Sequence, residues 1–395
     1  GLEKRPKLRF PGFDEPWKVF KAEELFQNIT DKNHPDETVL TIIQGKGTLP
    51  REQAGRNIHY DDASLSNYKK VEQGDFIIHL RSFEGGLEMA NEAGIVSPAY
   101  TILRCKRPHS SLFYDAYFHT DEFINHNLSK SVEGIRDGRQ ISYEAFKWLG
   151  IPYCEPTEQE KISNLFAALN ERIAKQRDLI EALKKYKRGL VSQILKQRLA
   201  ISHEDNEWKE VCLSDVAEGF EYGLNAAATA YDGKHKYIRI TDIDDDTHTY
   251  INQDPVSPSG AFEERYRVRE NDILFARTGA SVGKSYLYRK NDGDLFFAGF
   301  LIRIHVKEGV DGEYVFLNTL TEEYDKWVLL ESARSGQPGI NAEQYRKYRF
   351  KLPSLNTQRR IATIARNIDV QIQKEALHLR LLQKQKVGLL QQLFI

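Results

Sequence analysis

The chain contains one helical segment twice. The sequence LKKYKRGLVSQIL at residues 183–195 returns as LQKQKVGLLQQLF at residues 382–394, a shift of 199 positions, with Leu, Lys, Lys, Gly, Leu and Gln in register. Each copy ends a long helical pattern, and each pattern follows a segment of mixed globular character. This order of module, helix, module, helix predicts an internal pseudo-twofold. Such a protein suits a target with two half-sites, and duplex DNA is the commonest target of that kind.

Both helical patterns keep an apolar seam whose spacings alternate between four and three residues. Residues 157–160, Thr-Glu-Gln-Glu, have the sequence of a capping box, which predicts the start of the first helix. The vacant seam positions are polar and fall at matching offsets, Gln176 and Lys187 in one copy and Glu375 and Lys386 in the other. A 3.5-residue repeat over several heptads predicts a coiled coil, in which polar seam residues set the register. The predicted seam residues are Ile162, Phe166, Leu169, Ile173, Ile180, Leu183, Leu190, Ile194, Ile361, Ala365, Ile368, Ile372, Leu379, Leu382, Leu389 and Leu393.

The two helices can pair within one chain or between chains. At a rise of 1.5 Å per residue, about 40 residues span roughly 60 Å. We expect an intramolecular antiparallel coiled coil, which would relate the two modules by the pseudo-twofold. The alternatives are an ordinary helical hairpin and a homodimer interface.

Length and composition indicate a multidomain protein without a membrane span. The 395 residues exceed one ordinary domain. No apolar run of about 18 residues occurs, and the first residues lack the apolar region of a signal peptide. Cys105, Cys154 and Cys212 have no metal-ligand spacing and cannot all pair with one another, so we expect a reducing, cytoplasmic location.

The charges are unevenly distributed along the chain. The formal net charge is −1, yet residues 157–200 carry ten Lys/Arg against five Asp/Glu, and residues 357–395 carry seven against two, so each helical segment is +5. The remaining segments are acidic, −3 for residues 1–156 and −8 for residues 201–356. Two basic helices between two acidic modules are compatible with a nucleic-acid partner. Long solvated helices also favour Lys and Arg for their helix propensity alone.

The two modules have related strand patterns. Each opens near a tryptophan, Trp17 or Trp208, and each contains an apolar strand that runs into a glycine-bearing turn, at residues 74–86 and 271–280. Short β-rich runs with helical stretches predict a mixed α/β module of about 150 residues. We therefore expect an α+β chain with modules at residues 1–156 and 201–355 and spacer helices at 157–200 and 356–395.

Polar side chains on glycine-bearing turns are the candidate DNA contacts. Glycine lets the backbone approach a base edge or phosphate closely, and Arg, Asn and Gln carry donors that match base edges. For any single residue, a solvated surface turn is the simpler interpretation, so the prediction concerns an unspecified subset. The candidates are Lys46, Arg51, Arg56, Asn57, Arg81, Ser82, Tyr222, Asn225, Arg277, Thr278, Lys284, Arg334, Ser335 and Gln337.

Catalytic and nucleotide-binding signatures are missing. The run Gly279–Ser285 resembles a phosphate-binding loop, but it has three residues between its glycines where the motif has four, and the residues after it read as a strand. Such a loop could not present its amides at a helix N-terminus, so a simple β-turn is the better interpretation. We find no methyltransferase motif, no His/Cys metal cluster and no nucleophile elbow, and we expect a non-catalytic chain.

Several segments resemble specificity subunits of Type I restriction-modification systems. They are LRFPGFDEPW at residues 8–17, LRSFEGG at 80–86, GIVSPAY at 94–100, YIRITDI at 237–243 and DILFARTG at 272–279. The helix entries also resemble the family, with Ile151-Pro152 and Leu352-Pro353 ahead of the two helices. The second entry departs from the pattern, because Thr-Gln-Arg-Arg at residues 357–360 stands where acidic residues are usual. The order, duplication and spacing of these motifs cover essentially the whole chain.

The resemblance implies two target recognition domains, each reading one half of a split double-stranded DNA sequence. The paired helices would set the unspecified spacer and dock two modification methyltransferase subunits, and restriction subunits that translocate DNA would join that core. S-adenosylmethionine, ATP and Mg²⁺ would belong to the partner subunits. Alternatives from other classes are a stand-alone DNA-binding adaptor, a coiled-coil scaffold without restriction-modification partners, and a nuclease without a recognisable motif.

Overall fold

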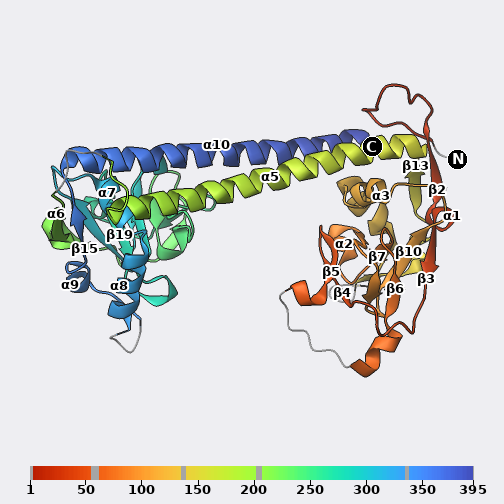
Figure 1. The fold of residues 1–395 in the computed structure, drawn as a ribbon, viewed down its shortest axis with the longest axis horizontal. Coiled ribbons are helices and arrows are strands. Elements are labelled where there is room, and N and C mark those ends of the chain that lie inside the picture. Colours follow the sequence, from red (N-terminus) through yellow and green to blue (C-terminus); the bar gives the residue numbers. More distant parts are fainter. Residues whose placement is uncertain (1–2, 55–61, 135–138, 202–206, 334–337, 395) are drawn as a thin grey trace. The chain divides into compact units, whose positions relative to one another are not determined.

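The chain has a mixed α/β fold with two long helices, as predicted (Figure 1). The computed structural model describes residues 3–54, 62–134, 139–201, 207–333 and 338–394. Within these residues no helix is long and apolar enough to cross a bilayer.

The chain divides into two compact units. Unit 1 consists of Gly1–Asp178 and Ala376–Ile395, and unit 2 consists of Leu179–Glu375. The long helices are α5 (Pro156–Leu195) and α10 (Leu355–Leu393). Each unit therefore contains one globular module, the first part of the helix that follows it and the last part of the other helix.

Unit 1 is built on a four-stranded antiparallel sheet of order β3-β10-β7-β8, beside a three-stranded sheet of order β1-β2-β13. Two further ladders pair β4 with β5 and β6 with β9. Its strands and helices are β1 (Glu3–Lys4), β2 (Trp17–Lys21), α1 (Ala22–Leu25), β3 (Phe26–Ile29), β4 (Leu40–Ile43), β5 (Gly47–Pro50), β6 (Lys69–Val71), β7 (Phe76–Ile78), α2 (Ser82–Gly85), β8 (Glu88–Met89), β9 (Gly94–Val96), β10 (Thr101–Cys105), α3 (Ser111–Phe118), β11 (Val132–Glu133), β12 (Gln140–Ile141), α4 (Tyr143–Phe146) and β13 (Gly150–Tyr153).

Unit 2 repeats this plan with a four-stranded antiparallel sheet of order β15-β22-β19-β20 and a ladder of β14 with β23. Along β22, buried Ile302, Ile304 and Val306 alternate with more exposed residues, the period expected of a strand with one covered face. The elements are β14 (Lys209–Cys212), α6 (Leu213–Val216), β15 (Ala217–Tyr222), β16 (Ala228–Ala230), β17 (Lys236–Ile238), β18 (Val256–Pro258), β19 (Asp272–Ala276), β20 (Ser285–Leu287), β21 (Leu295–Phe297), β22 (Leu301–Val306), α7 (Gly312–Asn318), α8 (Glu322–Ser332), α9 (Ala342–Tyr345) and β23 (Arg349–Leu352).

A buried aspartate marks equivalent places in the two sheets. Asp75 precedes β7 and Asp272 begins β19, and each carboxylate accepts the backbone N–H of the residue three positions earlier at 2.8 Å. Each also pairs with a basic side chain of the neighbouring strand at 2.7 Å, Arg104 in one case and His305 in the other. The residues that precede the two aspartates share a positive φ. The two strand ends can therefore be compared position by position.

The same type of hydrogen bond joins the first turn of each long helix to the module before it. The side-chain oxygen of Gln159 accepts the backbone N–H of Ser110, the residue before α3, at 3.0 Å. Gln358 accepts the backbone N–H of Asp311, the residue before α7, at 2.9 Å. Both glutamine side chains are buried, and each amide nitrogen donates to a backbone carbonyl five residues earlier. One buried amide thus joins the start of each long helix to the start of a module helix.

The helix boundaries differ from the sequence prediction. Helix α5 begins at Pro156, so Thr157 lies inside the first turn and is exposed, and the predicted capping box is wrong. Proline suits the first helical position because its missing N–H would have no partner there. The helix ends at Leu195 rather than near residue 200. The N–H of Gln197, whose φ is 56°, donates to Ile194, and the N–H of Arg198 donates to Gln193, which together form a Schellman motif.

All predicted seam residues are buried or half-buried. In unit 1, Leu169 and Ile173 of α5 cluster with Leu382 of α10. In unit 2, the amine of Lys187, at a polar seam position, binds both carboxylate oxygens of Asp369 at 2.6 and 2.7 Å. Burial lowers the pKa of the Lys386 amine, which occupies the matching position in the second copy. The seam therefore faces the other helix within each unit.

The last turn of each long helix enters a module core. In unit 1, the ring of Phe394 lies 5.1 Å from that of Phe113 and 6.1 Å from that of Trp17, measured between ring centroids. In unit 2, Val191 and Ile194 of α5 join the core around β19 and β22. The chain end is thus part of the hydrophobic interior of the N-terminal module.

A buried carboxylate fixes the β4–β5 hairpin. Glu88 accepts the backbone N–H groups of Gly45 and Gly47 at 2.6 and 2.9 Å and pairs with His119 at 3.3 Å. Burial opposes the charge of Glu88, but the hydrogen bonds from His119 and the two amides leave its pKa below its ordinary value. Burial also opposes the charge of His119, but the hydrogen bond to Glu88 and the charge of Asp115 raise its pKa. The pair holds the hairpin tip against β8.

We expect Phe394→Ala to destabilise unit 1 by about 3 kcal/mol, because truncating a buried Phe removes its burial and leaves a cavity. Urea unfolding, with hydrogen exchange in α3 as the local probe, measures the effect. Leu377→Ala on the same helix is the control, since Leu377 is 57% exposed and exposed substitutions usually change stability by less than about 0.5 kcal/mol. Equal destabilisation by the two variants would contradict the role of Phe394.

The Glu88–His119 pair predicts a pH dependence for the β4–β5 hairpin. Since the folded pKa of His119 is raised, its contribution is fully present below the ordinary value of 6.5 and is lost as pH rises through the folded pKa. Since the folded pKa of Glu88 is lowered, its contribution is present above 4.5 and is lost as pH falls through the folded pKa. Hydrogen exchange in β4 and β5 should therefore show that His119→Gln costs more stability at about pH 5.5 than at about pH 8.5. The same cost at both values would rule this linkage out.

Candidate nucleic-acid interface

The candidate turns at Tyr222 and at Arg277–Thr278 meet at the end of β19, together with residues 339–342, which follow the candidates of residues 334–337. The backbone carbonyl of Arg277 accepts the N–H of Ile340 at 2.9 Å, and Thr278 forms a β-bridge with Gly339. The hydroxyl of Tyr222, at the end of β15, accepts the N–H of Ala342 at 3.2 Å. Turns that are far apart in the sequence therefore form one surface, which we call the β19 end.

Arg277 is the central side chain of the β19 end. Its guanidinium lies 5.0 Å from the ring centroid of Tyr222, within the range of a cation–π contact. Its Nε is buried and has no hydrogen-bond partner among the residues that the structure describes. A buried donor without an acceptor costs about 1–3 kcal/mol. The side chain is therefore held in place while part of its hydrogen-bonding capacity is unused.

Phe300 also belongs to this surface, although sequence reasoning missed it. Its side chain is 59% exposed, and its carbonyl accepts the N–H of Arg277 at 3.1 Å. The Tyr222–Gly223 turn comes close to the same loop, because a Cβ on Gly223 would lie 2.2 Å from the carbonyl oxygen of Ala298. The sequence signal that could have identified Phe300 is an aromatic residue directly after a glycine, Gly299. Asn225, another candidate, is exposed on the loop that follows this turn.

In unit 1, two of the predicted segments are neighbours. Lys46 is exposed at the tip of the β4–β5 hairpin, and Arg81 is exposed ahead of α2. A Cβ on Gly85 of α2 would lie 1.9 Å from the side-chain amide of Gln44, so α2 packs against the hairpin tip. The Arg81 guanidinium is paired with Glu84 at 2.7 Å. These basic groups lie on one part of unit 1, with the Arg81 side chain already bound to a carboxylate.

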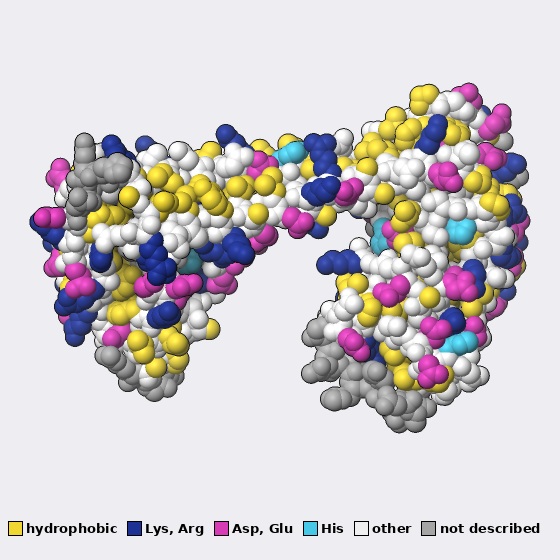
Figure 2. All heavy atoms as spheres, viewed as in Figure 1, with side chains coloured by type: hydrophobic (Ala, Val, Ile, Leu, Met, Phe, Trp, Pro, Cys, Tyr) yellow, Lys and Arg dark blue, Asp and Glu magenta, His cyan; other side chains and the backbone are white. Residues whose placement is uncertain are grey.

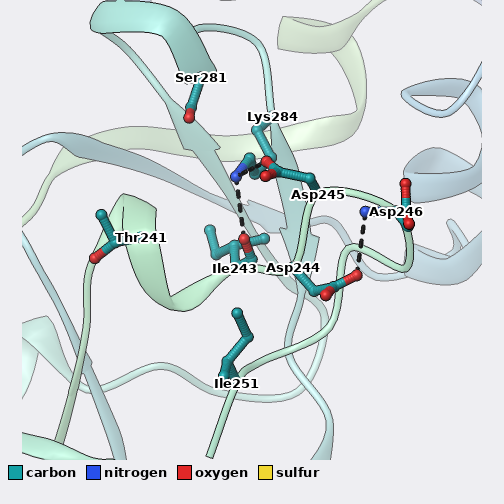
Figure 3. Close-up of a pocket in the computed structure, with 8 residues that line it drawn as sticks. All are labelled: Thr241, Ile243, Asp244, Asp245, Asp246, Ile251, Ser281 and Lys284. Atoms are coloured by element: carbon teal, nitrogen blue, oxygen red, sulfur yellow. Dashed lines mark hydrogen bonds and ion pairs between the residues drawn. The ribbon is translucent and has the colours of Figure 1, made fainter. Parts of the chain in front are cut away.

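The structure gives two of the candidates an internal role. Ser82 is fully buried, and its hydroxyl accepts the N–H of His79 at 2.9 Å. This hydrogen bond stabilises the turn after β7. The Lys284 side chain is only 10% exposed, and its amine binds the carbonyl of Ile243 at 3.0 Å and the carboxylate of Asp245 (Figure 3). Neither side chain has a free polar group at the surface.

The remaining candidates are less defined. Arg51 is half-buried after β5. The phosphate-loop-like run leads into strand β20, as its sequence predicted, so it has no helix N-terminus for a phosphate. Within the described part of the chain, no group of three or more His, Cys, Asp or Glu could hold a metal ion. Outside the described residues lie Arg56, Asn57, Arg334, Ser335 and Gln337.

The face drawn in Figure 2 is not uniformly basic. On the face drawn in Figure 2, Lys and Arg side chains are intermixed with Asp and Glu, and hydrophobic side chains are exposed along the long helices. The exposed apolar residues of these helices are Leu179, Tyr186, Val370, Leu377, Leu381 and Val387. On this face, contact with DNA would depend on local groups rather than on a uniform positive field.

Comparisons with known proteins agree with this architecture. Residues 205–380 match the family model of the Type I restriction modification DNA specificity domain. A Type I restriction-modification S subunit from M. genitalium has the same fold, with a TM-score of 0.54, 15% identity and 99% of each chain covered. The HsdS subunit from Thermoanaerobacter tengcongensis has a TM-score of 0.50 and 17% identity over 99% of this chain and 98% of its own.

A third structure, described as showing complex assembly and conformational transition of the type I R-M system, has a TM-score of 0.59 and 17% identity over 96% of this chain and 97% of its own. No curated protein sequence matches the chain. The family is one of specificity rather than catalysis. Residues 205–380 thus match the DNA specificity domain of Type I restriction-modification systems, and the whole chain has the fold of solved S subunits of those systems.

Proposed function

We propose that each unit reads one half of a bipartite DNA sequence. The observation that carries the proposal is the repetition of one plan, in which both units have a four-stranded sheet with equivalent strand order and a polar turn after the matching strand. The recognition modules would occupy residues 1–156 and 201–355. Side chains on these turns would contact base edges, and other basic groups would contact phosphates.

We propose in addition that α5 and α10 form an intramolecular antiparallel coiled coil that sets the spacer between the half-sites. The buried seam and the ion pair between Lys187 and Asp369 support the pairing. Exposed apolar side chains on the same helices, including Tyr186 and Leu381, suit a protein partner. That partner would be a pair of methyltransferase subunits, joined by restriction subunits. S-adenosylmethionine, ATP and Mg²⁺ would act in those subunits, and this chain would contribute no catalytic group.

Genome-wide adenine methylation tests the proposal directly. The chain is co-expressed with its neighbouring methyltransferase in a host without modification of its own. We expect a new two-part motif with a fixed gap, absent when this chain is omitted. If both proteins are soluble and co-purify but no motif appears, the chain is a DNA-binding adaptor or a scaffold instead.

The helices predict the length of the gap. Deleting one heptad from both helices, residues 174–180 and 373–379, should shorten each by about 10 Å and the gap by roughly three base pairs. Inserting one heptad at both places is the matched control and should lengthen the gap by the same amount. The methylated motif reads out both variants. An unchanged gap would show that the helices do not set the spacer.

A further inference from the structure

We propose that Arg277 reads a guanine in the half-site recognised by unit 2 and that Tyr222 is the positioning residue for its guanidinium. The inference rests on the proposed function, in which unit 2 contacts one half-site. Beyond that function, the inference specifies one base of the half-site, a guanine, and the group that selects it, the guanidinium of Arg277.

The state of the Arg277 side chain suggests a missing ligand. Several other guanidinium groups of unit 2 are paired with carboxylates, as in Arg239 with Asp242 and Arg303 with Asp272. Within residues 207–333 and 338–394, Arg277 has no carboxylate partner, and its buried Nε has no acceptor. The protein encloses the Nε, so an acceptor from a bound molecule would complete the site at the terminal amino groups of the guanidinium.

The backbone around Arg277 is fixed on both sides. Its N–H donates to Phe300 at 3.1 Å, and its carbonyl accepts from Ile340 at 2.9 Å. The side chain therefore projects from a rigid strand end rather than from a loose loop. Such a base suits a recognition group, because directional hydrogen bonds depend on a defined origin.

Tyr222 restricts the guanidinium further. Its ring lies 5.0 Å from the guanidinium carbon, and its hydroxyl is tied to the N–H of Ala342. A cation–π contact with an aromatic face restricts the guanidinium, so its N–H groups keep a narrower range of directions toward a ligand. The ring of Tyr222 therefore restricts the Arg277 guanidinium, and the hydrogen bond from Ala342 helps to hold the ring in place.

Guanine presents acceptors that match the edge of a guanidinium. Its major-groove edge offers two coplanar acceptors, O6 and N7, that match two parallel N–H groups of arginine. A phosphate can also accept two N–H groups of arginine, but a phosphate contact carries no sequence preference. The two ligands therefore differ in the sequence preference that the Arg277 contact would give.

The equivalent place in unit 1 has different chemistry. Five residues after Asp272 stands Arg277, and five residues after Asp75 stands Leu80, which is 63% exposed. The next residue, Arg81, has its guanidinium bound to Glu84 at 2.7 Å and 2.9 Å. Unit 1 thus lacks a free guanidinium at this position, so the guanine contact belongs to one half-site alone.

The test is selection from a library of random duplex DNA with the full chain and its co-expressed methyltransferase. The wild type should select a bipartite motif that contains a guanine in the half-site of unit 2. Arg277→Ala should reduce the preference for that guanine about 5- to 150-fold, the range that corresponds to one bidentate arginine–guanine contact. The other half-site should be unchanged, which also shows that the variant is folded.

Two Tyr222 variants separate positioning from simple stability. Tyr222→Phe keeps the ring over Arg277 and loses only the hydrogen bond from Ala342, so it should keep most of the guanine preference, whereas Tyr222→Ala should lower it although Arg277 is present. Arg349→Ala, an exposed arginine of β23, is the control and should leave the motif intact.

Other outcomes overturn the inference in distinguishable ways. A uniform loss of affinity for all sequences in Arg277→Ala, with a salt slope reduced by about one, would mean a phosphate contact. An unchanged motif would remove Arg277 from the interface and leave the proposed function standing. If the wild type selects no bipartite motif at all, the proposed function fails together with the inference.

Discussion

A buried glutamine amide at the start of each long helix is the contact on which the arrangement within each unit depends. Gln159 and Gln358 each accept the N–H at the start of a module helix and donate to a backbone carbonyl ahead of the long helix. A buried amide with both ends satisfied is directional, unlike hydrophobic packing, and leaving either end unpaired would be costly. The direction in which each helix leaves its module is therefore set by hydrogen bonds as well as by the core.

Around this shared contact the two units have diverged in their charged groups. In unit 1, Glu158 follows the helix start and binds Arg9 at 2.8 Å and the indole N–H of Trp17 at 3.0 Å. In unit 2 the same position is Thr357, and the buried carboxylate is instead Glu313 of α7, which pairs with Arg289. In each unit a buried carboxylate is thus paired with an arginine. The two units therefore share a buried carboxylate–arginine pair but form it from different residues.

The sequence predicted the features that depend on local periodicity. The duplicated heptads, the polar seam positions and the apolar strands before the Arg81 and Arg277 turns all follow from residues close together in the chain, and the structure has the corresponding helices and strands. Features that depend on distant partners were not predictable. The amine of Lys284 is occupied by a carbonyl 41 residues away. Phe394 looks like any apolar residue at a helix end, and only the fold shows that it fills the core beside Trp17.

The acidity of the modules constrains how such a chain can bind DNA. Residues 201–356 carry a net charge of −8, so this module would gain little from the non-specific release of counterions that dominates the binding of basic proteins to duplex DNA. Weak non-specific attraction favours discrimination, because the useful quantity is the ratio of specific to non-specific affinity. A few well-oriented donors on an acidic module raise that ratio more than a basic surface would. In the proposed function, the uneven charges would thus separate the two requirements, with specificity on the modules and positive charge on the helices.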